Sequence, residues 1–309
     1  MMMEDYLLEY KSRKIKDTTI LQYKNDLRII LIYILEHEDN RLITDLTKKD
    51  FRRFLLYLLE DCHLSNSRAN RLMSCCRSFL NFVEDEEEYA YENNQAAKIK
   101  GLPKESVRKI VFLKDDAIML LYQYFMDNGM YRDATLLALA YESAGRKSEL
   151  LQVNKDTIVD ISNCTNKVTG KRGKTFNLIY FEMTQKAGKK YLKERRDSIP
   201  YLFLNDEGKP ATTSNVYYWV LSWRKIYYKL TGENTAFNLH SFRHSALENY
   251  SLGTHEVCRN HNLGKVPIEK LSLLANHSSI AITQTYLKDK TNEELCEFFH
   301  IKNTCIIAD

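Results

Sequence analysis

The stretch "LHSFRHSALENY", residues 239–250, decides how this chain is interpreted, because it gathers His240, Arg243 and His244 within five positions. On a helix, residues three and four apart share a face, so the imidazole of His240 and the guanidinium of Arg243 can reach one anionic group. His240 and His244 also share a face, which suits a zinc ion. Three interpretations stay open: a zinc site, a phosphate site, or a helix without chemical function.

A zinc site would need further ligands, and "HEVCRNH" (255–261) supplies His255, Cys258 and His261 at three-residue spacings. However, no Cys-x-x-Cys pair occurs, and Arg243 would place a positive charge beside the metal. We therefore expect no metal and no other cofactor. The seven cysteines are odd in number and predict reduced thiols in a cytoplasmic protein.

The composition indicates two globular domains. A chain of 309 residues is long for one core, and 44% hydrophobic residues are too many for disorder. The net charge of +4 permits an anionic partner without demanding one. The start of the chain shows no signal-peptide pattern, and the longest apolar run, residues 27–36, is too short to span a bilayer, so we expect no membrane partner.

Residues 1–100 are predicted to form a compact helical domain, because apolar residues recur at spacings of three and four. Three of the predicted helices begin at capping residues: Asp17-Thr18-Thr19, Thr47, and Ser65 or Ser67. The predicted helices are 17–38, 46–61, 64–89 and a shorter one near 92–98. The third carries Arg68, Arg71 and Arg77 on its less apolar side.

A basic linker follows at residues 101–113, where Gly101 and Pro103 interrupt the helical pattern. The surrounding stretch is rich in lysine and arginine. Such a linker is often only solvated, but between two domains it can also follow a polyanion. The basic residues of the stretch 98–114 are Lys98, Lys100, Lys104, Arg108, Lys109 and Lys114, against Glu105 alone.

Residues 114–309 are predicted to form a second domain that is mainly helical and contains a small antiparallel sheet. The predicted helices are about 114–128, 131–143, 184–195, 213–230, 240–251 and 267–275. The predicted strands are 156–161, 166–170 and 175–181, with the turn "GKRGK" (170–174) between the last two. From Cys164 to Arg196 there are ten basic and two acidic residues, which indicates a phosphate-facing surface, with a solvated helix face as the alternative.

Two further stretches carry candidate chemistry. In "YESAGRKSELLQV" (141–153), small residues lead to Arg146, whose guanidinium at a helix start can bind a phosphate, although a surface pair with Glu149 is the alternative. In "LSLLANHSSIAITQTYLKDK" (271–290), Tyr286 follows His277 by nine residues. Each stretch alone is weak evidence.

Together these segments supply Arg146, a lysine on a turn, His240 with Arg243, His277 and Tyr286, and this order strongly resembles the tyrosine recombinase (phage integrase) family. "SAGRKSEL" resembles the family's first arginine box, "HSFRH" its His-x-x-Arg-His box, and "LLANHSSIAITQTY" its box from histidine to tyrosine. "TTILQYKNDLRIIL" and "SNSRANRLMSCCRSFLNFVEDEE" resemble helices of its core-binding domain. The resemblance covers nearly the whole chain, and it is to two-domain, Xer-like members without an arm-binding domain.

The chain departs from the family pattern at three places. Ser143-Ala144 stands where the family commonly has Thr-Gly, and Ala275-Asn276 where it commonly has Leu-Gly. The third is an insertion of some ten residues around 253–266, which we expect to be a loop. None of these departures removes a catalytic group.

The resemblance implies the fold and the reaction. The fold would be a helical, SAM-like core-binding domain (1–100) followed by an α+β catalytic domain (114–309). Arg146 and Arg243 would hold the phosphate, Tyr286 would attack it to form a 3′-phosphotyrosyl link, and His240 would accept the phenolic proton. His277 would donate to a phosphate oxygen. Lys171, with Lys174 as the alternative, would protonate the leaving 5′ oxygen, and neither ATP nor metal would be required.

The resemblance also implies the partners. The substrate would be double-stranded DNA with an inverted-repeat core site, contacted by Arg68, Arg71, Arg77, Lys98, Lys100, Lys104 and Lys174. Four copies would assemble on two duplexes, and the protein would be cytoplasmic and associated with the nucleoid. A tail (291–309) would link the copies by docking on a neighbouring subunit. Accessory DNA-bending proteins are possible further partners. Two alternatives are a type IB topoisomerase-like nicking-closing enzyme and a catalytically silent DNA-binding protein.

Overall fold

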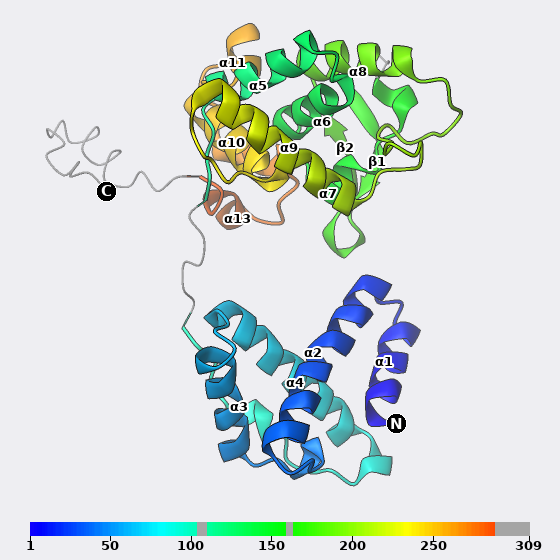
Figure 1. Ribbon diagram of the computed structural model, residues 1–309, viewed down its shortest axis with the longest axis vertical. Coiled ribbons are helices and arrows are strands. Elements are labelled where there is room, and N and C mark those ends of the chain that lie inside the picture. Colours follow the sequence, from blue (N-terminus) through cyan, green and yellow to red (C-terminus); the bar gives the residue numbers. More distant parts are fainter. Residues whose placement is uncertain (104–109, 159–162, 288–309) are drawn as a thin grey trace, which may run out of the picture. The chain divides into compact units, whose positions relative to one another are not determined.

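The computed structural model describes residues 1–103, 110–158 and 163–287. The chain divides into two compact units, Met1–Lys109 and Ile110–Asp309. The division falls inside the predicted linker (Figure 1). Each unit has its own hydrophobic core and is described separately.

The first unit is built from helices that pack their apolar faces together. Its α-helices are α1 (Met2–Ser12), α2 (Asp17–His37), α3 (Lys48–Glu60) and α4 (Asn66–Asp85), and its short 3₁₀ segments are η1 (Ile43–Asp45), η2 (Glu87–Tyr89) and η3 (Ala96–Lys98). Residues such as Ile30, Phe51, Phe54, Leu58 and Leu80 are fully buried in the core. The predicted helical domain is therefore present, and α1 is an addition that the sequence interpretation missed.

The helix starts show which capping predictions were right. Thr47 and Asp50 form a reciprocal capping box at α3, and Ser65 rather than Ser67 caps α4. The predicted cap at Asp17 is wrong, because Asp17 is already the first residue of α2. Its carboxylate there lies near the positive end of the helix dipole, which is also favourable.

The predicted fourth helix near 92–98 is wrong in extent, because only Ala96–Lys98 is helical and it forms a 3₁₀ turn. The side chain of Asn94 takes the place of helical hydrogen bonds. Its amide nitrogen donates to the Arg77 carbonyl over 3.0 Å, and its oxygen accepts from the Ala97 amide over 3.1 Å. Asparagine commonly competes with the backbone in this way.

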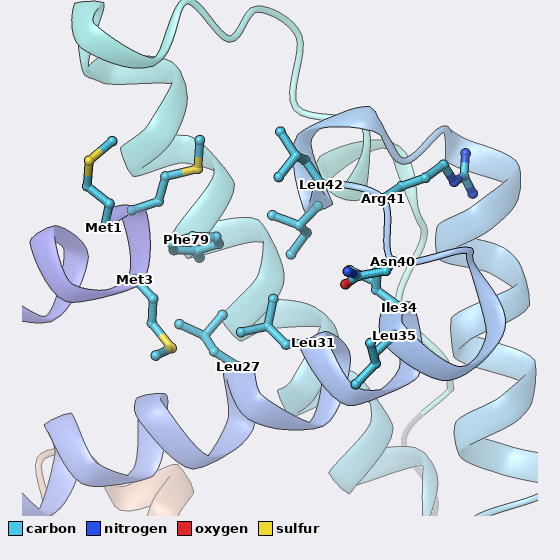
Figure 2. A pocket seen from close by; sticks show the side chains of 12 residues that line it. Met1, Met3, Leu27, Leu31, Ile34, Leu35, Asn40, Arg41, Leu42 and Phe79 are labelled. Atoms are coloured by element: carbon cyan, nitrogen blue, oxygen red, sulfur yellow. The ribbon is translucent and has the colours of Figure 1, made fainter.

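An apolar pocket of about 510 Å³ lies in the first unit. Figure 2 shows aliphatic and sulfur-containing side chains from the start of α1 and from α2, together with Leu42 and Phe79, around it. Asn40 and Arg41 are its polar residues. None of the residues proposed for catalysis lines this pocket.

The second unit is mainly helical, as predicted. Its helices are α5 (Asp115–Asp127), α6 (Tyr131–Glu142), α7 (Lys147–Leu150), α8 (Glu182–Glu194), α9 (Thr213–Thr231), α10 (Leu239–Leu252), α11 (Glu256–Asn260), α12 (Ile268–Leu274) and α13 (Ile280–Gln284). Every residue of α6 from Asp133 to Glu142 is buried. A helix that is buried all round is a core helix, and α5, α8 and α10 pack against it (Figure 1).

The sheet has two antiparallel strands, β1 (Cys164–Thr169) and β2 (Thr175–Ile179), with Val168 opposite Phe176. This confirms a mainly α fold with a small antiparallel sheet. The turn between the strands contains the 3₁₀ segment η5 (Lys171–Gly173).

The strand predicted at 156–161 is wrong over its first residues, since Lys155–Ile158 forms the 3₁₀ segment η4. The hydroxyl of Thr157 donates to the Asn154 carbonyl over 2.8 Å, which favours the turn, and Ile158 is buried in the core. Residues 159–161 of that prediction lie outside the described part of the chain.

The insertion at 253–266 is only partly a loop, because it contains α11 and buries His255, Val257 and Cys258, whereas residues 259–265 are exposed. His255 is fully buried, and its ring stacks on Tyr141 and Tyr250 with centroid distances of 4.0 and 3.7 Å. Its Nδ1 accepts from the Val257 amide over 3.1 Å, and its Nε2 lies 3.4 Å from the Tyr141 carbonyl. Burial lowers the pKa of His255 to about 3, so the ring is neutral at neutral pH.

Within the described ranges, no group of three histidine, cysteine, aspartate or glutamate side chains is placed to hold a metal ion.

None of the described helices has the length and apolar character needed to cross a membrane.

Replacing His255 with Phe should reduce the acid sensitivity of the second unit. The pKa of His255 is lower in the folded state than its ordinary value near 6.5, so its contribution to stability is present above pH 6.5 and is lost as pH falls toward 3. One such proton corresponds to a slope of about 1.4 kcal/mol per pH unit.

Urea unfolding followed by tryptophan fluorescence between pH 7 and pH 4.5 measures this slope. Both tryptophans, Trp219 and Trp223, lie in the second unit, so the signal reports that unit. The wild type should lose stability more steeply than His255→Phe as pH falls. Equal slopes would show that His255 is not the group that resists protonation.

Candidate active site

Helix α10 carries the central residues of the candidate site. Asn238 caps the helix, because its side chain accepts from the Ser241 amide over 3.1 Å while the Ser241 hydroxyl accepts from the Asn238 amide. The capped start fixes the first turns, which carry His240, Arg243 and His244. Arg243 is only 1% exposed, whereas His240 lies at the surface.

Arg243 ties three segments of the second unit together. Its Nη1 donates to the carbonyl of Ala144, which precedes α7, and its Nη2 donates to the carbonyl of Ala275, which follows α12, over 2.7 Å. The same Nη2 donates to Nε2 of His277 over 2.6 Å. The Nε of Arg243 is buried and has no hydrogen-bond partner among the described residues.

The guanidinium of Arg243 is therefore a buried cation whose contacts are neutral groups. Burial, followed by the charge of Arg146, lowers the pKa of Arg243 to about 10, so it is still protonated at neutral pH. A buried charge is costly unless it is paired. The site therefore holds positive charge that is suited to an anion.

Arg146 brings a second guanidinium to this site from the start of α7. The buried carboxylate of Glu149 accepts from the Arg146 amide over 2.8 Å and from its Nη1 over 2.9 Å. The side chain of Arg146 remains 28% exposed. Gly145 permits this turn, because a Cβ there would lie 2.7 Å from the Leu150 side chain. The pairing of Arg146 with Glu149 that the sequence offered as an alternative is therefore present, and the buried Glu149 holds both the backbone and the side chain of Arg146.

The turn between β1 and β2 borders the arginine segment. A Cβ on Gly170 would lie 3.2 Å from Oε1 of Glu149, so the turn passes close to the partner of Arg146. Gln152 fastens the same strand by exchanging two hydrogen bonds with the backbone of Thr169, over 3.1 and 2.9 Å. Lys171 and Lys174 are exposed on this turn. The geometry leaves the choice between the two lysines open.

The two histidines predicted for catalysis are neutral for the same physical reasons. Desolvation by the surrounding protein, followed by the neighbouring His244 and the two arginines, lowers the pKa of His240 to about 4, although part of this residue reaches the surface. Burial, followed by Arg243 and Arg146, lowers the pKa of His277 to about 3. Both rings are therefore uncharged at neutral pH.

His277 has partners on both ring nitrogens. An arginine can only donate, so the bond from Arg243 requires an unprotonated Nε2, and the proton sits on Nδ1, which lies 2.9 Å from Oγ1 of Thr283. The predicted donation from His277 to a phosphate oxygen needs a different protonation state, and it stays a prediction.

Tyr286 lies at the centre of this cluster and is half-buried. Cζ of Arg243 is 5.2 Å from the centroid of its ring. The rings of His240 and His277 lie 5.5 and 4.8 Å away, centroid to centroid. His244 stacks on Tyr286 at 4.3 Å with an angle of 21° between the planes. The fold thus gathers around one phenol ring an arginine and three histidines that lie up to 46 residues away in the sequence.

Residues 111–293 match the Phage integrase family, and residues 3–87 match its N-terminal SAM-like domain. The chain belongs to the phage integrase family. This confirms the predicted family, the predicted SAM-like character of the first part, and the predicted class of enzyme, a site-specific tyrosine recombinase.

Individual relatives agree with this assignment. The tyrosine recombinase XerD of Oceanobacillus iheyensis is 26% identical over 287 residues, which cover 89% of this chain and 88% of that protein. The structure of the Tn1549 transposon integrase in complex with circular intermediate DNA has a TM-score of 0.69 at 17% identity, covering 95% of this chain and 98% of that one. A lambda integrase tetramer bound to a Holliday junction has a TM-score of 0.63 at 14% identity, covering 90% and 76%.

The two substitutions for the integrase family's glycines both lie in the left-handed backbone region. Ala144 has φ of 49° and Asn276 has φ of 53°. Both positions adjoin Arg243, which bonds to the carbonyls of Ala144 and Ala275. Asparagine tolerates this conformation, whereas alanine is strained in it.

Some of the residues predicted to contact DNA in the first unit already bind groups within that unit, whereas others are exposed. Arg68 and Arg71 both pair with the buried carboxylate of Asp26, over 2.7 and 3.2 Å. Arg77 donates to the carbonyls of Ala96 and Ile99 and thereby holds the end of the unit. Lys98 and Lys100 are exposed, and Lys104 lies outside the described residues. A role in DNA binding stays a prediction for all of them.

His244 is the group of this cluster that the predicted catalytic set omitted. The sequence already indicated that His244 belongs to this cluster, since it directly follows Arg243 and lies four residues after His240. Its stacking on Tyr286 could not be read from spacing, because the tyrosine belongs to another segment.

Replacing Ala144 with Gly should stabilise the second unit by about 0.5–1 kcal/mol, because relief of left-handed strain outweighs the greater freedom of glycine in the unfolded chain. The matched change Asn276→Gly should have a smaller effect, since asparagine already tolerates this backbone. Urea unfolding followed by tryptophan fluorescence measures both. Destabilisation by Ala144→Gly would contradict the strain assigned to this position.

Proposed function

We propose that this recombinase cuts and rejoins DNA strands through a 3′-phosphotyrosyl intermediate at Tyr286, without ATP or metal. The observation that carries this proposal is the buried guanidinium of Arg243 beside the ring of Tyr286, where no carboxylate among the described residues pairs with it. A cation in such a place favours an anion, and the phosphodiester group supplies one.

The two guanidiniums account for the electrostatic part of the reaction. Attack on a phosphodiester places negative charge on its non-bridging oxygens. Arg146 and Arg243 present planar, permanently charged donors to this charge, and their positions are fixed before the reaction by Glu149 and by the carbonyls that hold Arg243. Such preorganisation lowers the barrier because no reorganisation is needed as charge develops.

Proton transfers complete the step. As the phenolic oxygen of Tyr286 bonds to phosphorus, its proton passes to His240, which is neutral and can accept it. A bound phosphate adds negative charge next to His240 and raises the pKa of its ring, which makes it a better base. The bond from phosphorus to the 5′ oxygen breaks, and Lys171 or Lys174 supplies a proton to that oxygen. Rejoining reverses these transfers.

His277 has two parts in this proposal. In the unbound protein it accepts a hydrogen bond from Arg243 and helps to orient the guanidinium. A phosphate that draws the Arg243 donor away frees Nε2, which would have to gain a proton before donating to a phosphate oxygen.

The related structures support DNA as the substrate and a multimer as the active form. The Tn1549 integrase is bound to circular intermediate DNA, and lambda integrase forms a tetramer on a Holliday junction. We infer that this chain binds double-stranded DNA with an inverted-repeat core site, and that four copies assemble on two duplexes in contact with the nucleoid. The tail expected to link neighbours, 291–309, lies outside the described residues, and accessory DNA-bending proteins stay an expectation.

A suicide DNA substrate that carries the inverted repeats flanking this protein's own gene tests the proposal. The wild type should form a covalent protein–DNA adduct in EDTA, with the labelled peptide containing Tyr286. Tyr286→Phe should abolish the adduct and leave DNA binding within about twofold, since the ring and its stacking are kept.

Tyr228→Phe is the matched control, because Tyr228 is 56% exposed on α9. It should form the adduct at the rate of the wild type. An adduct on another residue, or one that persists in Tyr286→Phe, would contradict the mechanism. DNA binding without any adduct would favour a silent DNA-binding protein, and relaxation of plasmids lacking the site would favour a topoisomerase.

A further inference from the structure

We propose that His244 is a positioning residue that holds the ring of Tyr286 in the plane required for attack. This inference rests on the proposed role of Tyr286 as the nucleophile. It concerns a residue whose contacts are made with Tyr286 rather than with the expected phosphate.

The ring contacts of Tyr286 differ in kind. His240 meets its ring nearly edge-on, with 73° between the planes, and His277 is tilted by 40°. Only His244, among the rings placed around Tyr286 in the described structure, lies nearly parallel to it, at 21° and 4.3 Å. A parallel neighbour restricts rotation of the ring about its own axis, whereas an edge contact restricts it less.

His244 also approaches the backbone of the same residue. Its Nδ1 lies 3.5 Å from the Tyr286 carbonyl, at the long end of the hydrogen-bond range. A carbonyl can only accept, so this contact places the proton on Nδ1. One imidazole thus contacts both the ring and the main chain of Tyr286, and it couples the tyrosine to α10, the helix that carries Arg243.

Tyr286 needs such support because of its place in the chain. It follows α13, a helix of only five residues, and its own amide donates to the Thr283 carbonyl over 2.9 Å. His244, in contrast, lies within the fourteen-residue helix α10, and the ring of Phe112 meets it edge-on at 6.0 Å. The rigid helix therefore determines where the phenol of the short segment lies.

The ring of His244 must also stay uncharged. His240 and Arg243 lie beside it on α10, with Arg146, His277 and Tyr286 facing the same cluster from other segments. Burial lowers the pKa of His244, which keeps the ring neutral. Stacking on Tyr286 requires only a neutral aromatic ring, so a phenylalanine at position 244 should still position Tyr286.

The kinetic test compares His244→Ala, His244→Phe and the wild type on the suicide substrate, under single-turnover conditions and over a range of pH. His244→Ala should form the Tyr286 adduct about 10- to 100-fold more slowly, the effect of a nucleophile displaced by up to an ångström. DNA affinity and the melting temperature should be unchanged. His244→Phe should recover to within about threefold of the wild type and keep the same pH profile.

His261→Ala is the matched control, because His261 is a partly exposed histidine of the same unit that pairs with Glu182. It should react at the wild-type rate. If His244→Phe is as slow as His244→Ala, His244 acts through its nitrogens and the positioning role is wrong. Adduct formation by His244→Ala at the wild-type rate would also overturn it.

A second measurement does not depend on activity. With 3,5-difluorotyrosine at position 286, a ring held in one plane gives two fluorine signals, whereas a rapidly flipping ring gives one averaged signal. The wild type and His244→Phe should give two signals, and His244→Ala should give one. Two signals in His244→Ala, or one in the wild type, would overturn the inference. Two wild-type signals without any DNA adduct would instead refute the proposed function alone.

Discussion

The buried guanidinium of Arg243 is the interaction on which the site depends. Its donors reach the carbonyls of Ala144 and Ala275 and the ring of His277. These groups come from the segment before α7 and from the single segment between α12 and α13, so one side chain of α10 fixes the mutual position of these two segments. The same group lies 5.2 Å from the ring of Tyr286. The guanidinium of Arg243 therefore both holds the fold together at this place and lies beside the proposed nucleophile.

The electrostatics of this arrangement favour a bound anion. Both guanidiniums lie close together, and Glu149, which holds Arg146, is the carboxylate that the described contacts bring to them. Like charges at short range raise the free energy of the unbound protein, and a phosphate lowers it again. The lowered pKa values of His240 and His277 have the same origin in burial and neighbouring positive charge. Phosphate binding would change the charge state of the whole cluster.

Motif order pointed to His240, Arg243, His277 and Tyr286, and the fold brings these four side chains together. Local periodicity predicted the long helices. Periodicity failed where tertiary contacts determine the local structure. Helix α1 was missed, although Tyr6 is buried against α4. The segment η4 stands where a strand was predicted, and its residue Ile158 is buried in the core. Spacing could not show that His255 is a stacked core residue or that Asp26 binds Arg68 and Arg71. Such partners lie far away in the sequence.

The central claim is that Arg243 and Arg146 act by neutralising charge on the scissile phosphate. The most direct measurement is the adduct rate of Arg243→Ala and Arg146→Ala on a normal substrate and on one whose scissile phosphate is a neutral methylphosphonate. Removing a group that stabilises transition-state charge typically costs about 10²- to 10³-fold. The account predicts a loss of this size on the phosphate and a much smaller one on the methylphosphonate. Equal losses on both substrates would contradict it.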